Sequence, residues 1–194
     1  MTAGNDHALL IIRPARPEDA ATVSEIVMAA YQRHVPVIGR PPGPMNDDYD
    51  TRIAAGQVWV LEDSVCPSHA ESPKTDKKTR KQRIRICRGF NQNRTESSGR
   101  IDGILVLENG PDHFLLDNIA IRPDRQGDGL GRALLDFAEA EATRTGWSRI
   151  TLYTHALMTE NRVIYAGRGY REIARRCEKG FDRVYMEKNL SFGG

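Results

Sequence analysis

Residues 121–132 read Ile-Arg-Pro-Asp-Arg-Gln-Gly-Asp-Gly-Leu-Gly-Arg, and they decide the fold prediction. An apolar run ends at Ile121 and an amphipathic helical pattern begins at Leu130, so this stretch is expected to link a strand to a helix. Its glycines let successive backbone N–H groups face one point at the helix N-terminus, where the helix dipole also favours an anion. The stretch is therefore predicted to hold a phosphate group.

Two common phosphate-binding motifs are excluded by the spacing within this stretch. No Gly-Lys-Ser or Gly-Lys-Thr follows, as a P-loop requires, and G-x-G-x-G differs from the G-x-G-x-x-G of dinucleotide-binding folds. From the glycines alone, a glycine-rich helix start without a ligand is an equally good interpretation. The rest of the chain decides between the two.

The flanking sequence predicts strands and helices within one domain, because a chain of 194 residues fits a single core. Apolar periodicity, turn residues and helix-stop signals place these elements along the chain. Strands are expected at 9–12, 58–61, 104–107, 114–121, 150–154, 170–177 and 183–188, and helices from 17 to before 40, at 47–55, at 130–145 and at 159–166.

Residues 64–99 differ in composition from the rest of the chain. They have few aliphatic side chains and many Lys, Arg, Ser, Thr, Asn and Gln, a composition that buries too little apolar surface to become ordered. We interpret them as a polar, basic, disordered insertion between two strands of a hairpin. The prediction is therefore an N-terminal tail at 1–8 and a single domain at 9–190 that carries this insertion.

Composition limits the classes of function. The formal net charge is +2, and much of the positive charge lies in Lys74–Arg88. Nucleic-acid binding through that run is disfavoured, because charge runs are usually solvated and only Phe90 offers a stacking surface. Three separated cysteines without metal-ligand spacing predict no metal site and fit a reducing compartment. The short apolar run at 8–12 is too brief for a signal peptide or a spanning helix, so a cytoplasmic protein without a membrane partner is expected.

The pattern Gln126-x-x-Gly129-x-Gly131 resembles the Q/R-x-x-G-x-G/A pyrophosphate motif of the GCN5-related N-acetyltransferase (GNAT) family. Three further segments resemble this family's opening, its central strand and its asparagine–tyrosine segment, namely residues 11–19, 116–123 and 158–170. Asn161 stands four residues before Tyr165, whereas many members of the family have a spacing of seven.

The resemblance implies an α/β (α+β) fold with a mixed, mostly antiparallel sheet of about seven strands, helices on both faces and a splay between the fourth and fifth strands. It also implies acetyl-CoA as co-substrate. In the family the pantetheine arm lies in the splay against the central-strand backbone, and the pyrophosphate lies on the glycine loop, which is residues 126–131 of this chain. The cofactor-binding residues that the resemblance implies are Ile119, Ala120, Ile121, Gln126, Gly127, Asp128, Gly129, Leu130, Gly131, Arg132 and Asn161.

The resemblance further implies N-acetyl transfer by direct attack of an amine in a ternary complex. The family's tyrosine that matches Tyr165 protonates the departing CoA thiolate, and the backbone N–H of Ile119 is the candidate oxyanion donor. Taken alone, Tyr165 is better interpreted as a packing tyrosine. The general base stays open between Asp117 in an apolar strand, His155 at a strand end, a water molecule, and no enzymic base.

The expected acceptor is a small-molecule amine or a protein amino group, and a homodimer is compatible with the resemblance. The alternative function is a family member that binds acyl-CoA as a sensor or scaffold without turnover. The presence of Tyr165 favours catalysis over this alternative.

Overall fold

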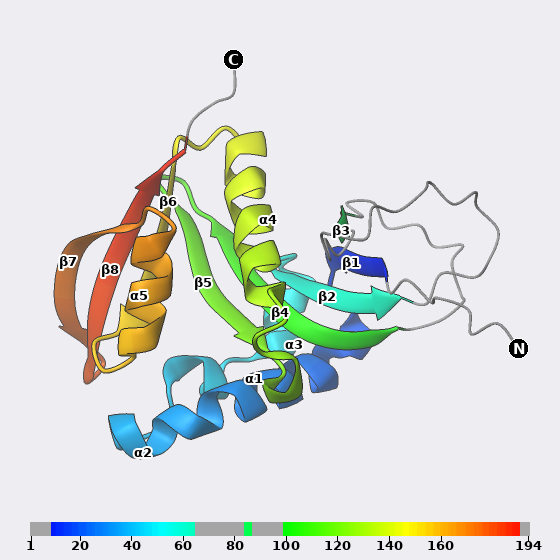
Figure 1. Ribbon diagram of the computed structural model, residues 1–194, viewed down its shortest axis with the longest axis horizontal. Coiled ribbons are helices and arrows are strands. Elements are labelled where there is room, and N and C mark those ends of the chain that lie inside the picture. Colours follow the sequence, from blue (N-terminus) through cyan, green and yellow to red (C-terminus); the bar gives the residue numbers. More distant parts are fainter. Residues whose placement is uncertain (1–8, 65–83, 87–98, 191–194) are drawn as a thin grey trace, which may run out of the picture.

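The computed structural model describes residues 9–64, 84–86 and 99–190. They form one eight-stranded sheet with the strand order β3-β1-β2-β4-β5-β6-β8-β7 (Figure 1). Among the described strands only β1 with β3 and β5 with β6 pair in parallel, which confirms the mixed, mostly antiparallel sheet. The strands are β1 (Leu9–Pro14), β2 (Val58–Ser64), β3 (Ile84–Ile86), β4 (Arg100–Asn109), β5 (Phe114–Ile121), β6 (Arg149–His155), β7 (Arg171–Glu178) and β8 (Phe181–Asn189).

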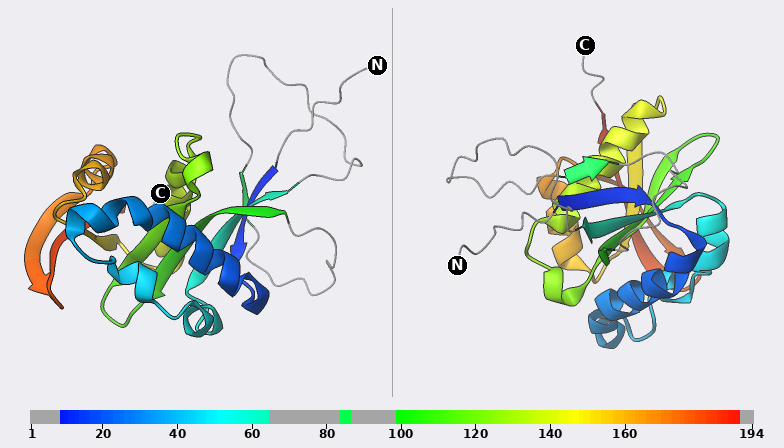
Figure 2. Two further views of the ribbon diagram at one scale, coloured as in Figure 1. Left: turned by 90° about the horizontal axis from the view of Figure 1, so that it is seen from below. Right: turned by 90° about the vertical axis from the view of Figure 1, so that its right-hand side faces the viewer.

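Helices cover both faces of the sheet, as predicted (Figure 2). They are α1 (Ala20–Tyr31), α2 (Val35–Ile38), α3 (Tyr49–Ala54), α4 (Leu130–Arg144) and α5 (Thr159–Gly167). The apolar stripe of α1 buries Val23 and Ile26 together with side chains of α3, β2 and β4. On the opposite face, Leu130 and Leu134 of α4 pack with β5, β6 and α5. Each face of the sheet therefore has its own core.

The strands on either side of the predicted insertion pair directly with each other. β2 and β4 are antiparallel, from Val58 opposite Val106 to Asp63 opposite Arg100. This pairing confirms the hairpin that is expected when the insertion is removed from the sequence.

One short strand lies within the segment that the sequence predicts to be a disordered insertion. Ile84–Ile86 forms β3 and pairs in parallel with β1, which gives the sheet one strand more than expected. Three residues in a polar surrounding contain too little apolar alternation to reveal a strand. Residues 65–83 and 87–98, on which the rest of that prediction falls, lie outside the described residues.

We expect that replacing residues 64–99 with Asn-Gly leaves a folded and active protein. Asp63 and Arg100 lie opposite each other, so two residues close the hairpin, and Asn-Gly favours the type I′ turn that such a loop adopts. Circular dichroism, a melting curve and acetyl-CoA turnover compare the shortened chain with the full chain. An insoluble product, or one without a cooperative melting transition, would show that the insertion belongs to the core.

A β-bulge on β5 decides which of its side chains face α1 and α3. Val106 of β4 lies opposite Asn118, but the next residue, Leu107, lies opposite Leu116, so Asp117 has no partner on β4. Successive side chains of a regular strand point to opposite faces. The extra residue cancels this alternation, and the side chains of both Asp117 and Asn118 contact residues of the α1–α3 layer.

β5 and β6 separate after a short parallel contact. They pair at Leu115 opposite Thr151 and at Leu116 opposite Leu152, and β6 then stays with β8 as far as His155 (Figure 1). This is the splay predicted between the fourth and fifth of the expected strands. The last residues of β5 therefore have no partner strand on the β6 side, and we call this break in the strand pairing the opening between β5 and β6.

Candidate functional site

The glycine loop follows a 3-10 turn, η4 (Pro123–Arg125), and leads into α4. Gly127 and Gly129 have φ values of +91° and +83°, a left-handed conformation that side chains disfavour, so both positions favour glycine. Gly129 is the N-cap of α4, and no side chain caps this helix start. The first N–H groups of the helix and the positive end of its dipole therefore meet at an exposed point, which suits a phosphate group.

The predicted cofactor-binding residues around the loop offer different groups. Leu130 is 1% exposed and packs in the core, so it can offer only its backbone. The Gln126 side chain donates to the carbonyl oxygen of Ile121 at 3.1 Å and so braces the loop. Arg132 is exposed on α4, and Asn161 is half-buried in the first turn of α5.

Ile119, Ala120 and Ile121 pair with β4 but have no partner strand on the β6 side, beside the splay. The side chains of Ile119 and Ile121 pack toward α4, and that of Ala120 packs toward α1. The side chains thus point to the two faces of the sheet, and the backbone of these residues faces β6.

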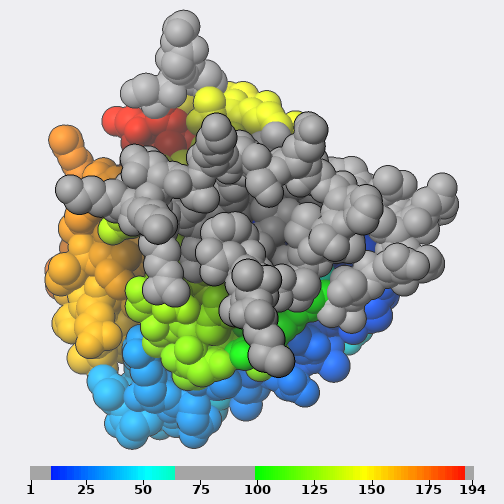
Figure 3. Space-filling model, turned by 45° about the vertical axis from the view of Figure 1, so that its right-hand side comes forward, coloured from blue at the N-terminus to red at the C-terminus, as the bar shows by residue number. Residues whose placement is uncertain are grey.

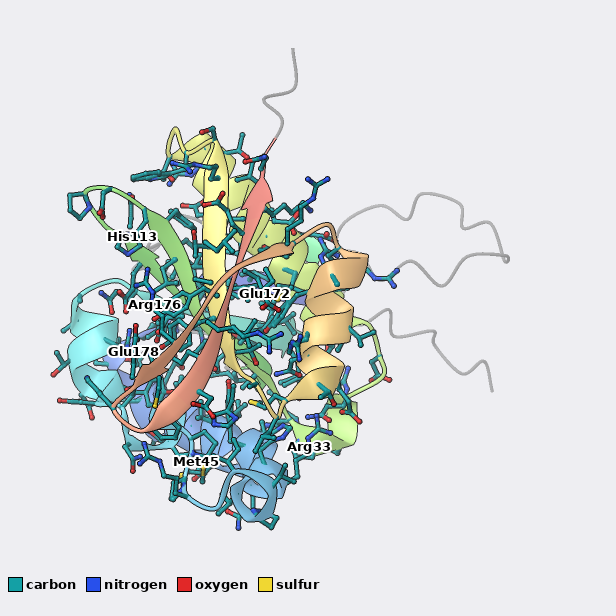
Figure 4. All side chains as sticks on the ribbon, turned by 90° about the vertical axis from the view of Figure 1, so that its left-hand side faces the viewer. Arg33, Met45, His113, Glu172, Arg176 and Glu178 are labelled. Atoms are coloured by element: carbon teal, nitrogen blue, oxygen red, sulfur yellow. The ribbon has the colours of Figure 1, made fainter. Side chains whose placement is uncertain are left out.

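Arg33, in the turn after α1, links the glycine loop to α5 (it is labelled in Figure 4). Its Nη1 donates to Gln126 Oε1 at 3.3 Å, and its Nη2 lies 3.8 Å from a Glu160 carboxylate oxygen at the start of α5. In the space-filling view the yellow-green surface of the loop lies between the orange surface of α5 and the blue surface of α1 and α2 (Figure 3). The loop, α5 and the end of α1 are therefore neighbours.

Tyr165 lies on the buried side of α5, with its ring 5.9 Å from that of Tyr170. Burial raises the pKa of Tyr165 to about 12, so its hydroxyl is protonated at neutral pH. No described residue forms a hydrogen bond with this hydroxyl. Tyr165 packs in the α4-side core, and Tyr31 packs against the core on the other face. Burial raises the pKa of Tyr31, and the Tyr165 phenol raises it further.

Asp117 is buried between a hydroxyl and a guanidinium group. Tyr153 donates to Asp117 Oδ1 at 2.5 Å, and Arg52 Nη2 lies 2.9 Å from Oδ2. Arg52 also pairs with Asp47 and Glu108, so one guanidinium faces three carboxylates. Burial raises the pKa of Asp117, although the Tyr153 hydrogen bond and the Arg52 charge lower it. The raised pKa makes this carboxylate a better proton acceptor than an ordinary aspartate.

Asn118 is a site residue that the sequence analysis does not identify. Its Oδ1 accepts a hydrogen bond from Tyr31 at 2.8 Å, and its Nδ2 donates to the Tyr49 hydroxyl at 2.9 Å. Tyr49 in turn donates to the carbonyl oxygen of Pro44. Asn118 is 2% exposed and ties α1 and α3 to β5 beside the opening. The only signal in the sequence is a second polar residue in an apolar strand.

The sequence over residues 92–172 matches the family model described as an acetyltransferase (GNAT) domain. This segment of the chain is similar to GNAT domains. The match begins in the predicted insertion and ends at the start of β7, so it contains β5, the glycine loop, α4, β6 and α5. No curated protein matches the sequence.

Solved acetyltransferase structures share the fold of this chain at low identity. The ribosomal-protein-S18-alanine N-acetyltransferase of Escherichia coli is 18% identical, with a TM-score of 0.61 over 96% of this chain and 97% of that one. An acetyltransferase of the GNAT family from Listeria monocytogenes is 16% identical, with a TM-score of 0.62 over 98% and 99%. PaiA N-acetyltransferase from Thermoplasma acidophilum, solved in complex with coenzyme A, is 15% identical, with a TM-score of 0.61 over 93% and 99%.

His155, the second candidate base, ends β6. It follows Tyr153 by two residues and so lies on the same face of the sheet as Tyr153. Its Nδ1 accepts a hydrogen bond from the Leu157 N–H at 3.2 Å, and partial burial lowers its pKa, so the ring is neutral at pH 7. Both candidate bases thus lie on one face, but no hydrogen bond or ion pair joins His155 to Asp117 within the described ranges.

No helix in the described part of the chain is long and apolar enough to cross a membrane. The same residues contain no group of three or more His, Cys, Asp and Glu side chains arranged to hold a metal ion.

Proposed function

We propose that this chain is a GNAT acetyltransferase that transfers the acetyl group of acetyl-CoA to a primary amine by direct attack in a ternary complex. The observation that carries the proposal is the opening between β5 and β6. It has an anion-binding helix start at one end, an unpaired backbone edge along one side, and the Tyr165 hydroxyl without a hydrogen-bond partner among the described residues. A pyrophosphate fits the helix start, and a pantetheine amide fits the unpaired edge.

Acetyl-CoA supplies an acyl group activated as a thioester. We place the glycine loop on its phosphates and the backbone of Ile119, Ala120 and Ile121 along its pantetheine arm. The amine nitrogen bonds to the carbonyl carbon, and the bond from this carbon to sulfur breaks. A backbone N–H fixed near the carbonyl oxygen, for which Ile119 is the candidate, stabilises the developing oxyanion by about 3 kcal/mol.

Two residues move the protons in this proposal. Tyr165 gives its hydroxyl proton to the departing thiolate, which requires a protonated phenol, and burial keeps the phenol protonated. Asp117 takes the proton that the amine loses when the new bond forms. After the products leave, solvent returns a proton to Tyr165 and removes the one on Asp117, so each residue regains its starting state.

Asp117 is favoured over His155 as the base for two reasons. The bulge places Asp117 on β5, next to the unpaired edge, whereas His155 lies at the end of β6. Burial raises the pKa of Asp117 toward neutrality, whereas burial lowers the pKa of His155 and makes it a weaker base.

Asp117→Asn is expected to lower kcat by about 10²-fold, the lower end of the range for a lost general base, with little change in acetyl-CoA affinity. Asp47→Asn is the matched control, because it removes another carboxylate from Arg52 away from β5. In the wild type, kcat/KM rises with pH as Asp117 loses its proton. This rise occurs at a higher pH than the pKa of an ordinary aspartate, because burial raises the pKa of Asp117. The variant loses this acidic limb. Equal kcat in the two variants would remove Asp117 from the mechanism and leave His155 to be tested.

The proposed acceptor is a small-molecule amine or a protein amino group. The residues of the α1–α3 layer that contact Asp117 and Asn118 would lie on its side of the opening, with Tyr31, Tyr49 and Arg52 closest to β5. A panel of polyamines, amino acids, aminoglycosides and peptides tests this directly, with the acetylated product detected by mass spectrometry.

A further inference from the structure

The glycine loop carries a carboxylate of its own. Asp128 stands between Gly127 and Gly129, within the stretch that would receive the cofactor's phosphates. Its side chain is 48% exposed. A carboxylate beside a phosphate site repels the anion and weakens its binding, unless a cation neutralises it.

Arg125 supplies such a cation from the turn directly before the loop. Its Nε lies 3.0 Å from Asp128 Oδ2, within hydrogen-bond distance. Its Nη1 lies 2.5 Å from Asp102 Oδ2 on β4 and 3.4 Å from Asp63 Oδ2 on β2. One guanidinium therefore joins the loop to two strands of the sheet.

Asp102 is a firm attachment point for this guanidinium. Its side chain is 0% exposed, and Arg100 Nε lies 2.9 Å from its second oxygen. The carbonyl oxygen of Asp102 accepts a hydrogen bond from the backbone N–H of Arg122 at 2.9 Å. The carbonyl oxygen of Ile101 accepts one from Arg122 Nε at 2.7 Å. The chain that leads into the loop is thus fixed to β4 by both backbone and side-chain contacts.

We propose that Arg125 is a positioning residue for the phosphate site, which holds and neutralises Asp128 and anchors the loop to Asp102. The inference rests on the proposed function, in which the loop binds the pyrophosphate of acetyl-CoA. Arg125 acts through Asp128, because its side chain is only 20% exposed and its Nε and Nη1 groups already face carboxylates. A lysine has one compact charge and cannot bridge these carboxylates as a guanidinium does.

A double-mutant cycle with CoA as the titrant tests this inference by calorimetry. Arg125→Ala is expected to raise the Kd for CoA by about tenfold, because Asp128 is then free to repel the phosphates. Asp128→Asn alone is expected to leave the Kd unchanged or to lower it. The double variant Arg125→Ala/Asp128→Asn is expected to bind CoA within about threefold of the wild type. This rescue separates neutralisation of Asp128 from a general loss of structure.

Arg13→Ala is the matched control, since Arg13 also joins two largely buried carboxylates, Asp19 and Glu62, but forms no hydrogen bond or ion pair with the described residues of the glycine loop. It is expected to lower the melting temperature without changing the Kd for CoA. If Arg125→Ala does not fold, Arg125→Lys replaces it. Its Kd for CoA is expected to lie between that of the wild type and that of Gly129→Glu, a variant that places a carboxylate at the start of α4 and is expected to prevent CoA binding.

Three results would overturn the inference. These are a wild-type Kd for a folded Arg125→Ala or Arg125→Lys variant, a double variant that binds CoA as weakly as Arg125→Ala alone, and an equal loss of affinity in Arg13→Ala. Each of them leaves the proposed function intact if the wild-type chain binds CoA and Gly129→Glu does not. Absence of CoA binding by the wild-type chain would overturn both.

Discussion

Tyr165→Phe is expected to lower kcat by about 10² to 10⁴-fold while acetyl-CoA affinity stays near that of the wild type. Phenylalanine keeps the ring that packs beside Tyr170 in the α4-side core and removes only the hydroxyl. This hydroxyl is protonated, because burial raises the pKa of Tyr165 to about 12, and no described residue uses it as a hydrogen-bond partner. Its loss should therefore affect the departing thiolate much more than the fold. Initial rates and binding calorimetry measure the two effects separately.

Tyr170→Phe is the control for this substitution. Tyr170 is a second buried tyrosine of the same core, so its substitution removes a comparable hydroxyl from a comparable environment. We expect near wild-type kcat from Tyr170→Phe. A purely structural role for Tyr165 predicts the same result for both variants, namely a shift in melting temperature with kcat per folded molecule preserved. That outcome would favour a protein that binds acyl-CoA as a sensor or scaffold.

Gly129→Glu is expected to raise the Kd for CoA by at least about 10²-fold. The added carboxylate stands at the N-cap of α4, where the pyrophosphate is proposed to bind, so two negative groups compete for the same N–H donors and the same end of the helix dipole. The substitution also strains the backbone, because Gly129 has a φ of +83°. Calorimetry with CoA measures the effect in protein whose folding is checked by circular dichroism.

Gly146→Glu separates strain from ligand competition. Gly146 follows the other end of α4 with a φ of +91°, and a Cβ there meets no atom within 4 Å, as at Gly129. The two variants therefore carry the same new side chain and similar backbone strain at opposite ends of one helix. CoA affinity that falls equally in both, or in neither, would contradict the phosphate site at Gly129.

Much of the fold could be predicted because it depends on local patterns. The stripes of α1 and α4 repeat every three or four residues, and the positive φ values at Gly127 and Gly129 favour glycine, which is visible in the sequence. The hairpin of β2 and β4 could be inferred because a short apolar run flanks the insertion on each side, at 58–61 and 104–107. These features need only the residues of one element or of its direct neighbour.

The parts of the site that could not be predicted depend on contacts between distant elements. The bulge at Asp117 arises where the register between β4 and β5 shifts, between Val106 and Leu107 of β4. The sequence of one strand does not contain this register. Asn118 becomes a site residue only because this bulge turns it toward Tyr31, which lies 87 residues away in the sequence. The partners of Arg125 likewise come from β2, β4 and the loop itself, so the ion-pair network follows from the assembled sheet.

Amine-dependent acetyl transfer requires that an acceptor amine accelerates thiol release from acetyl-CoA. Thiol release from acetyl-CoA is followed with a panel of amines while mass spectrometry counts the acetylated product. The proposed function predicts that at least one amine accelerates thiol release, with one N-acetylated product for each free CoA and with most of the rate lost in Tyr165→Phe. Tight CoA binding with no amine that accelerates thiol release above the rate without an acceptor would contradict catalysis by this protein.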